Sequence, residues 1–69
     1  MNIRERLDYA LQNPLKVGYV TYTGHVMTAA ECESYNRYTR EAARPGITAK
    51  ARDFLLDQRH LFFVLVSER

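Results

Sequence analysis

The sequence predicts a small α+β domain, in which three short helices pack against a two- or three-stranded antiparallel sheet. Three observations lead to this fold class. Apolar residues recur at helical spacing in residues 3–12 and 29–43, and β-branched and aromatic side chains are concentrated in residues 15–22. Residues 60–66, HLFFVLV, form an unbroken apolar run of strand length. The expected order is α-β-(β)-α-α-β in one domain spanning residues 1–69, and the bracketed hairpin arm is left open.

The first expected element is an amphipathic helix over residues 3–12. Leu7 and Leu11 are four residues apart and share an apolar face with Ile3. Asn2 can cap the amino end of this helix, and Pro14 follows its carboxyl end, where a helix cannot continue.

A strand is expected next, over residues 15–22, because this segment is rich in the residue types that favour extended backbone. The pair Thr23-Gly24 permits a tight turn, after which residues 25–27 can pair back as a short hairpin arm. The sequence therefore predicts that the chain reverses direction at Gly24.

The stretch that follows this turn predicts a rigid joint between the hairpin and a helix. Thr28 and Glu31 have the spacing of a capping box, in which each side chain accepts a hydrogen bond from the other residue's backbone amide. Met27 and Cys32 occupy the two positions of a hydrophobic staple, which fixes the angle at which the chain enters the helix.

Two helices are expected after this joint. The helix over residues 29–43 ends at Pro45-Gly46 and turns one face inward, made of Cys32, Tyr35, Thr39 and Ala42. The next helix, over residues 49–59, is expected to bury Ala51, Phe54, Leu55 and the stem of Gln58.

Residues 60–66 are expected to be the last strand, and three short helices can hardly cover both faces of so small a sheet. Side chains alternate along a strand, so one set would be packed by the helices and the other would form an apolar patch. We assign Leu61, Phe63 and Leu65 to the inner face. Phe62, Val64 and Val66 then form a surface for a homodimer or another protein partner, although the pattern alone fits either assignment.

Composition limits the class of protein. Hydrophobic residues make up 46% and charged residues 26% of the chain, as in ordinary globular proteins. The single cysteine excludes an internal disulfide and indicates a reducing compartment, so we expect a cytoplasmic protein. The amino-terminal residues lack the apolar run of a secretory signal, and the apolar run at 60–66 is too short to cross a bilayer, so no membrane association is expected.

No catalytic or metal-binding pattern is present in the sequence. His25 and Cys32 could pair as base and nucleophile, but Cys32 falls on the expected inner face of its helix and no third orienting residue accompanies the pair. His25 and His60 lack the spacing of helical metal ligands to Asp53 or Asp57. The sequence therefore predicts a protein that is not an enzyme and has no catalytic residue, metal site or cofactor.

One helix face carries a stripe of arginines at helical spacing, with Tyr38 beside it and two further basic residues nearby: Arg37, Arg40 and Arg44, then Lys50 and Arg52. Arginine suits both phosphate and carboxylate recognition. Glu33 and Glu41 lie on the same face, each four residues from Arg37, and would repel a nucleic-acid backbone. The stripe is a candidate partner-binding surface, and an ordinary solvated face is the alternative.

These observations favour a small interaction module that binds the surface of a macromolecular partner. We expect a regulator or inhibitor, encoded by a bacterium, phage or mobile element, with a protein partner and a homodimeric form. The alternative is a nucleic-acid-binding regulator that uses the arginine stripe.

Overall fold

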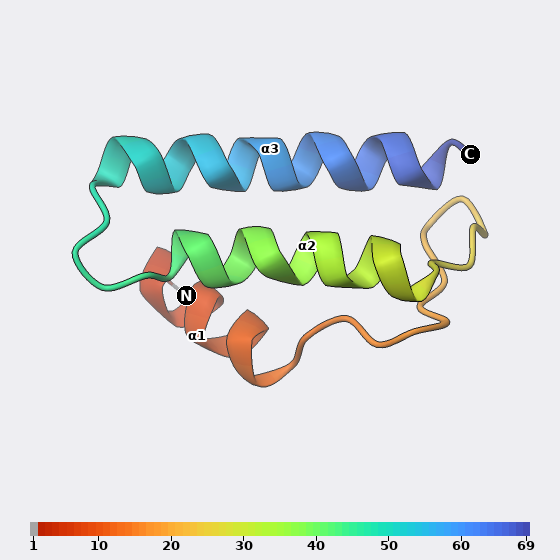
Figure 1. Ribbon diagram of the computed structural model, residues 1–69, viewed down its shortest axis with the longest axis horizontal. Coiled ribbons are helices and arrows are strands. Elements are labelled where there is room, and N and C mark those ends of the chain that lie inside the picture. The colour runs from red at the N-terminus through yellow and green to blue at the C-terminus, as the bar shows by residue number, and fades with distance from the viewer. Residues whose placement is uncertain (1) are drawn as a thin grey trace.

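The computed structural model describes residues 2–69 and is helical (Figure 1). Its elements are α1 (Ile3–Gln12), α2 (Ala29–Ala42) and α3 (Ala49–Ser67). Within residues 2–69 there is no β-strand and no sheet, so the predicted α+β fold is wrong. The only trace of β structure in this range is one isolated antiparallel bridge between Val20 and Val26.

The local signals for α1 and α2 were interpreted correctly. Asn2 caps α1, its side chain accepting a hydrogen bond from the Glu5 amide at 2.9 Å. Thr28 and Glu31 form the predicted capping box of α2. Both helices have the expected bounds to within a residue because their start and stop signals lie in adjacent sequence.

The predicted last strand is wrong, because residues 60–66 continue the helix that begins at Ala49. Thr48 caps this helix, and neither glycine nor proline interrupts the 19 residues of α3. Adding a turn to an existing helix is far less costly than starting a new element. Helical spacing also replaces strand alternation, so the predicted inner and outer sets no longer hold: Val66 is fully buried, whereas Leu61 and Leu65 are exposed.

The predicted strand over residues 15–22 is likewise absent as regular structure. Gly18 has φ of 91°, a left-handed conformation that ends any extended run, and its amide donates to the Met27 carbonyl at 3.1 Å. The chain still reverses at the predicted turn, where the Gly24 amide donates to the Thr21 carbonyl at 3.0 Å. The hairpin is therefore an irregular loop held by a few backbone hydrogen bonds.

A small core lies where this loop meets the two long helices. Met27, Cys32 and Val66 are each at most 3% exposed and pack together. They come from the loop, from α2 and from the carboxyl end of α3, so the predicted staple residues Met27 and Cys32 are indeed core residues. Leu15, Tyr35, Phe62 and Phe63 pack around them and are only partly buried.

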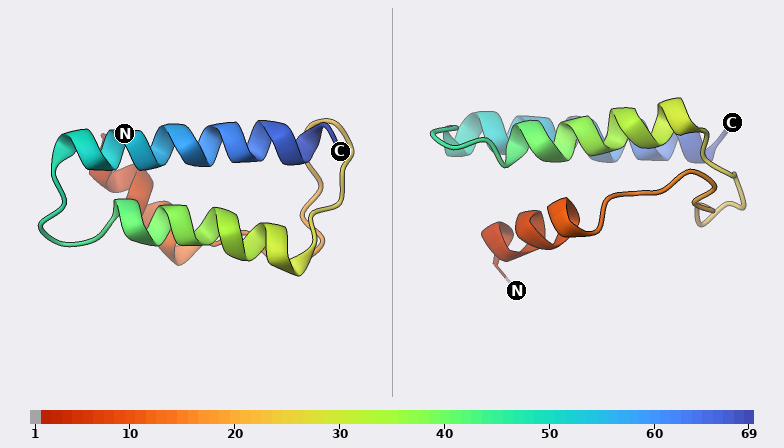
Figure 2. Two further views of the ribbon diagram at one scale, coloured as in Figure 1. Left: turned by 45° about the horizontal axis from the view of Figure 1, so that its top comes forward. Right: turned by 60° about the horizontal axis from the view of Figure 1, so that its bottom comes forward.

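The two long helices run antiparallel beside each other, and α1 and residues 13–28 lie on one side of this pair (Figures 1 and 2). The Thr23 hydroxyl donates to the Ser67 carbonyl and ties the loop to the end of α3. The edge of α3 that faces away from α2 has no other element over it. Phe54, which we expected to be buried, is 61% exposed. Phe54 lines a shallow hollow with Glu41 of α2, whereas Phe62 and Val66, farther along α3, pack into the core with Cys32 of α2.

Candidate functional site

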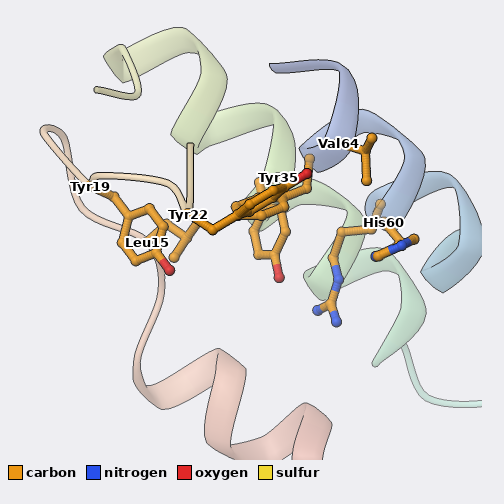
Figure 3. A pocket seen from close by; sticks show the side chains of 8 residues that line it. Leu15, Tyr19, Tyr22, Tyr35, His60 and Val64 are labelled. Atoms are coloured by element: carbon orange, nitrogen blue, oxygen red, sulfur yellow. The ribbon is translucent and has the colours of Figure 1, made fainter. Parts of the chain in front are cut away.

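An aromatic hollow of about 540 Å³ opens between the loop, α2 and α3 (Figure 3). Three segments distant in sequence supply its lining. Tyr19 and Tyr22 come from the loop, Tyr35 comes from α2, and His60 and Val64 come from α3. The complete lining is Leu15, Tyr19, Tyr22, Tyr35, Arg59, His60, Phe63 and Val64.

Phe63 is the ring that holds the other aromatic side chains together. Its centroid lies 6.4 Å from that of Tyr19 and 5.8 Å from that of Tyr35, both in edge-to-face geometry. Tyr22 is tilted against the same ring at 6.1 Å. Such pairs contribute about 0.5–1.5 kcal/mol each beyond the area they bury. The tyrosines are therefore ordered by a shared contact, although Tyr22 remains 71% exposed.

Arg59 brings a positive charge to the aromatic hollow. Its guanidinium carbon lies 4.9 Å above the Tyr35 ring, and one terminal nitrogen donates to the Thr39 hydroxyl at 2.9 Å. In residues 2–69 no carboxylate lies within ion-pair distance of Arg59. A guanidinium has five N–H donors, so Arg59 can donate to a further acceptor without losing its present contacts.

The lining of the hollow is mainly aromatic and apolar. Its lining contains no carboxylate or thiol, and its polar groups are the tyrosine phenols, His60 and Arg59. Its volume is in the range of ligand pockets, and its apolar rings with a few polar groups at the edge are typical of recognition sites.

His25 and Cys32, considered above as a catalytic pair, are engaged separately. His25 Nε2 lies 3.0 Å from Glu31 Oε1, whereas the Cys32 thiol donates to the Lys16 carbonyl at 3.3 Å. Burial raises the pKa of the Cys32 thiol, which disfavours the nucleophilic thiolate.

Glu31 is the best connected polar side chain of the described residues. Oε1 accepts from the Thr28 amide at 2.9 Å and contacts the His25 ring, and Oε2 accepts from Arg69 at 2.8 Å. The hydrogen bond from the Thr28 backbone, followed by that from His25, lowers the pKa of Glu31 to about 2. These contacts tie together the loop, the start of α2 and the end of the chain, which is a structural role.

Arg37 and Arg40 of the predicted arginine stripe lie on α2 and Arg44 follows its end, but part of the stripe is already neutralised. Arg40 pairs with Glu33 at 2.6 Å, and Arg52 on α3 pairs with Asp53 at 3.2 Å. Arg37 and Arg44 are exposed, as is Lys50, and these three have no ion pair among residues 2–69. Arg44 and Arg52 line a hollow of about 300 Å³ beside α1, and Arg44 and Lys50 line a shallow one of about 580 Å³, so the predicted basic residues are divided between two hollows and do not form one site.

The three apolar residues predicted to bind a partner, Phe62, Val64 and Val66, do not share one face, because residues 60–66 form a helix and not a strand. Val66 is fully buried in the core and presents no surface, because it faces α2. Phe62 is half-buried, with its ring 6.2 Å from that of Tyr38. Only Val64 of this set lines the aromatic hollow.

Sequence reasoning did not identify the tyrosines, Arg59 or Phe63 as one site. The one available signal was the presence of five tyrosines in a chain of 69 residues, two of them beside the predicted turn. Tyrosine is enriched in binding surfaces, but only the packing of the loop against α3 brings Tyr19 and Tyr22 to Phe63.

Comparison of the chain with protein-family models, curated proteins and solved structures gives no significant match. Among residues 2–69, no three histidine, cysteine, aspartate or glutamate side chains gather where they could hold a metal ion. None of the helices in the same range combines the length and apolar character needed to cross a bilayer. Function is therefore inferred from the geometry alone.

Proposed function

We propose that this chain is a non-enzymatic protein-binding module, a small cytoplasmic regulator or inhibitor that acts by occupying a segment of a partner protein. The observation that carries the proposal is the aromatic hollow, in which tyrosines from the loop and α2 surround Phe63 on α3. Aromatic-lined grooves bind extended segments, because the rings pack on proline or aromatic side chains at little entropic cost.

The charge at the hollow narrows the chemistry of the bound segment. Arg59 has free donors beside the rings, and no carboxylate lines the hollow. A carboxylate of the partner could therefore form a charge-assisted hydrogen bond with Arg59 while a neighbouring apolar side chain packs on the rings. The proposed ligand is an extended peptide segment with a proline or aromatic anchor and an acidic residue nearby.

Selection from a random peptide library tests this proposal directly. Peptides enriched on the folded protein are expected to contain a proline or aromatic residue with an adjacent acid. In an NMR titration, such a peptide should shift the amide resonances of Tyr19, Tyr22 and Val64. Selection of no peptide, or of peptides that shift resonances elsewhere, would overturn the proposal.

A pair of tyrosine substitutions provides a matched control. Tyr22 is 71% exposed and Tyr9, on α1 and outside the hollow, is 63% exposed, so neither substitution removes a core side chain. Tyr22→Ala should weaken binding of a selected peptide by about tenfold, since an anchor ring at an interface is worth more than 1 kcal/mol. Tyr9→Ala should leave the affinity unchanged. Equal losses in the two variants would contradict binding in the hollow.

A further inference from the structure

A second apolar surface lies along an exposed side of α3. Phe54, Leu61 and Leu65 are 61%, 53% and 64% exposed, and their spacing of seven and four residues places them in one line. We call this line, with Ala51, Gln58 and Glu68 at the intervening positions, the α3 seam. It follows the repeat by which helices pair in coiled coils.

We propose that the α3 seams of two copies of this chain pack antiparallel and form a homodimer. The spacing of the seam is self-complementary in that direction. When Gln58 lies opposite Leu61 of the second copy, Phe54 lies opposite its Leu65 and Ala51 opposite its Glu68. The two-fold axis then repeats each contact, as an interface between identical chains requires.

The two ends of the seam differ in shape in a way that fits this pairing. A shallow hollow of about 580 Å³ opens beside the amino end of α3, and α2 contributes Glu41 to it. The other lining residues are Arg44, Thr48, Lys50, Ala51, Phe54 and Leu55. Leu65 projects from the opposite end of the seam. Antiparallel pairing brings Leu65 of each copy to the hollow of the other, where Ala51, Phe54 and Leu55 supply the apolar part of the lining.

Charge favours the same direction and disfavours the parallel one. Lys50 and Glu68 are separated by a whole number of helical turns and therefore lie on one side of α3. Neither has an ion pair within residues 2–69. Antiparallel pairing sets Lys50 beside Glu68 of the second copy, twice in the dimer. Parallel pairing would place like charges together at both ends.

The signs of these two charges are unfavourable for α3 by itself. The first turn of the helix has no acidic residue and its last turn has no basic one, while Lys50 and Glu68 occupy the two ends. Each charge thus has the same sign as the helix dipole at its position. An ion pair between copies accounts for a charge pattern that the isolated helix does not favour.

The dimer is tested by sedimentation velocity on the full chain from low to high micromolar concentration. The native protein is expected to shift from monomer to dimer. Leu65→Asp should weaken dimerisation by about a hundredfold or more, because the substitution places two desolvated carboxylates in the interface. Val17, which is 70% exposed in the loop, supplies the control: Val17→Asp should dimerise as the native chain does.

A charge exchange tests the direction of pairing. Lys50→Glu and Glu68→Lys should each weaken the dimer by about tenfold, and the double variant should restore it. The melting temperature of the dilute monomer should not fall in Lys50→Glu, because a negative charge suits the amino end of α3. If Lys50 had only a structural role, Lys50→Glu would lower the dimer affinity and the melting temperature of the monomer together.

These measurements do not depend on the proposed peptide binding, since Tyr22→Ala leaves the α3 seam intact. The dimer proposal is overturned if the native chain stays monomeric at high micromolar concentration, or if Leu65→Asp and Val17→Asp dimerise equally well. It is also overturned if the double charge variant dimerises no better than the single ones.

Discussion

Removal of the Thr28 hydroxyl tests how much the joint between loop and α2 contributes to stability. Thr28 Oγ1 accepts a hydrogen bond from the Glu31 amide at 3.2 Å, and the Glu31 side chain returns a bond to the Thr28 amide at 2.9 Å. Thr28→Ala removes the first bond and leaves the second. Loss of such a cap costs about 1 kcal/mol, out of a total stability of about 3–10 kcal/mol for a chain of this length.

We expect Thr28→Ala to lower the melting temperature by about 4–8 °C. The melting temperature is measured from the helical circular dichroism signal. Thr28→Ser keeps the hydroxyl and should recover most of the loss. Thr48→Ala provides a comparison, because Thr48 caps α3 through one bond, to the Ala51 amide at 3.1 Å, without a returning glutamate. If Thr28→Ala melts like the native protein, or Thr28→Ser melts as low as Thr28→Ala, the cap is not what stabilises this joint.

Two further predictions follow from the charged groups. The folded pKa of Glu31, about 2, lies below its ordinary value of 4.5, so the stability due to its ionised form is present above pH 4.5 and is lost as the pH falls toward 2. Urea unfolding between these pH values should show this loss, and Glu31→Gln should flatten the slope; an equal slope in both proteins would contradict the role of Glu31. Random-sequence DNA should bind weakly, because Arg40 and Arg52 already pair with carboxylates. Fluorescence anisotropy that shows micromolar affinity at moderate salt, abolished by Arg37→Glu, would favour the nucleic-acid alternative instead.

The aromatic hollow shows why the candidate site could not be predicted from the sequence. Phe63 was expected to face inward on a strand, and it does contact the interior, but as part of a helix and beside three tyrosines. Tyr22 and Phe63 are about 40 residues apart in the chain, and no local pattern relates them. Their contact exists because the loop folds back on the end of α3.

The amino-acid sequence by itself determined the starts of all three helices. Asn2, Thr28 and Thr48 cap them through hydrogen bonds to amides three residues away, and such bonds depend on adjacent residues alone. The reversal of the chain at Gly24 is local in the same sense, because glycine adopts the required positive φ at no steric cost.

Only the tertiary structure decided the state of residues 60–66 and of residues 15–22. An apolar run is compatible with either a strand or a buried helix, so its local preference could not select one. A strand needs a partner along its whole length, and the loop offers little beyond the bridge of Val20 to Val26. Extending α3 satisfies the backbone within the helix and brings Phe62 and Val66 against α2. The hydrogen bonds and the packing of distant residues, rather than the propensity of the run, therefore fixed this part of the fold.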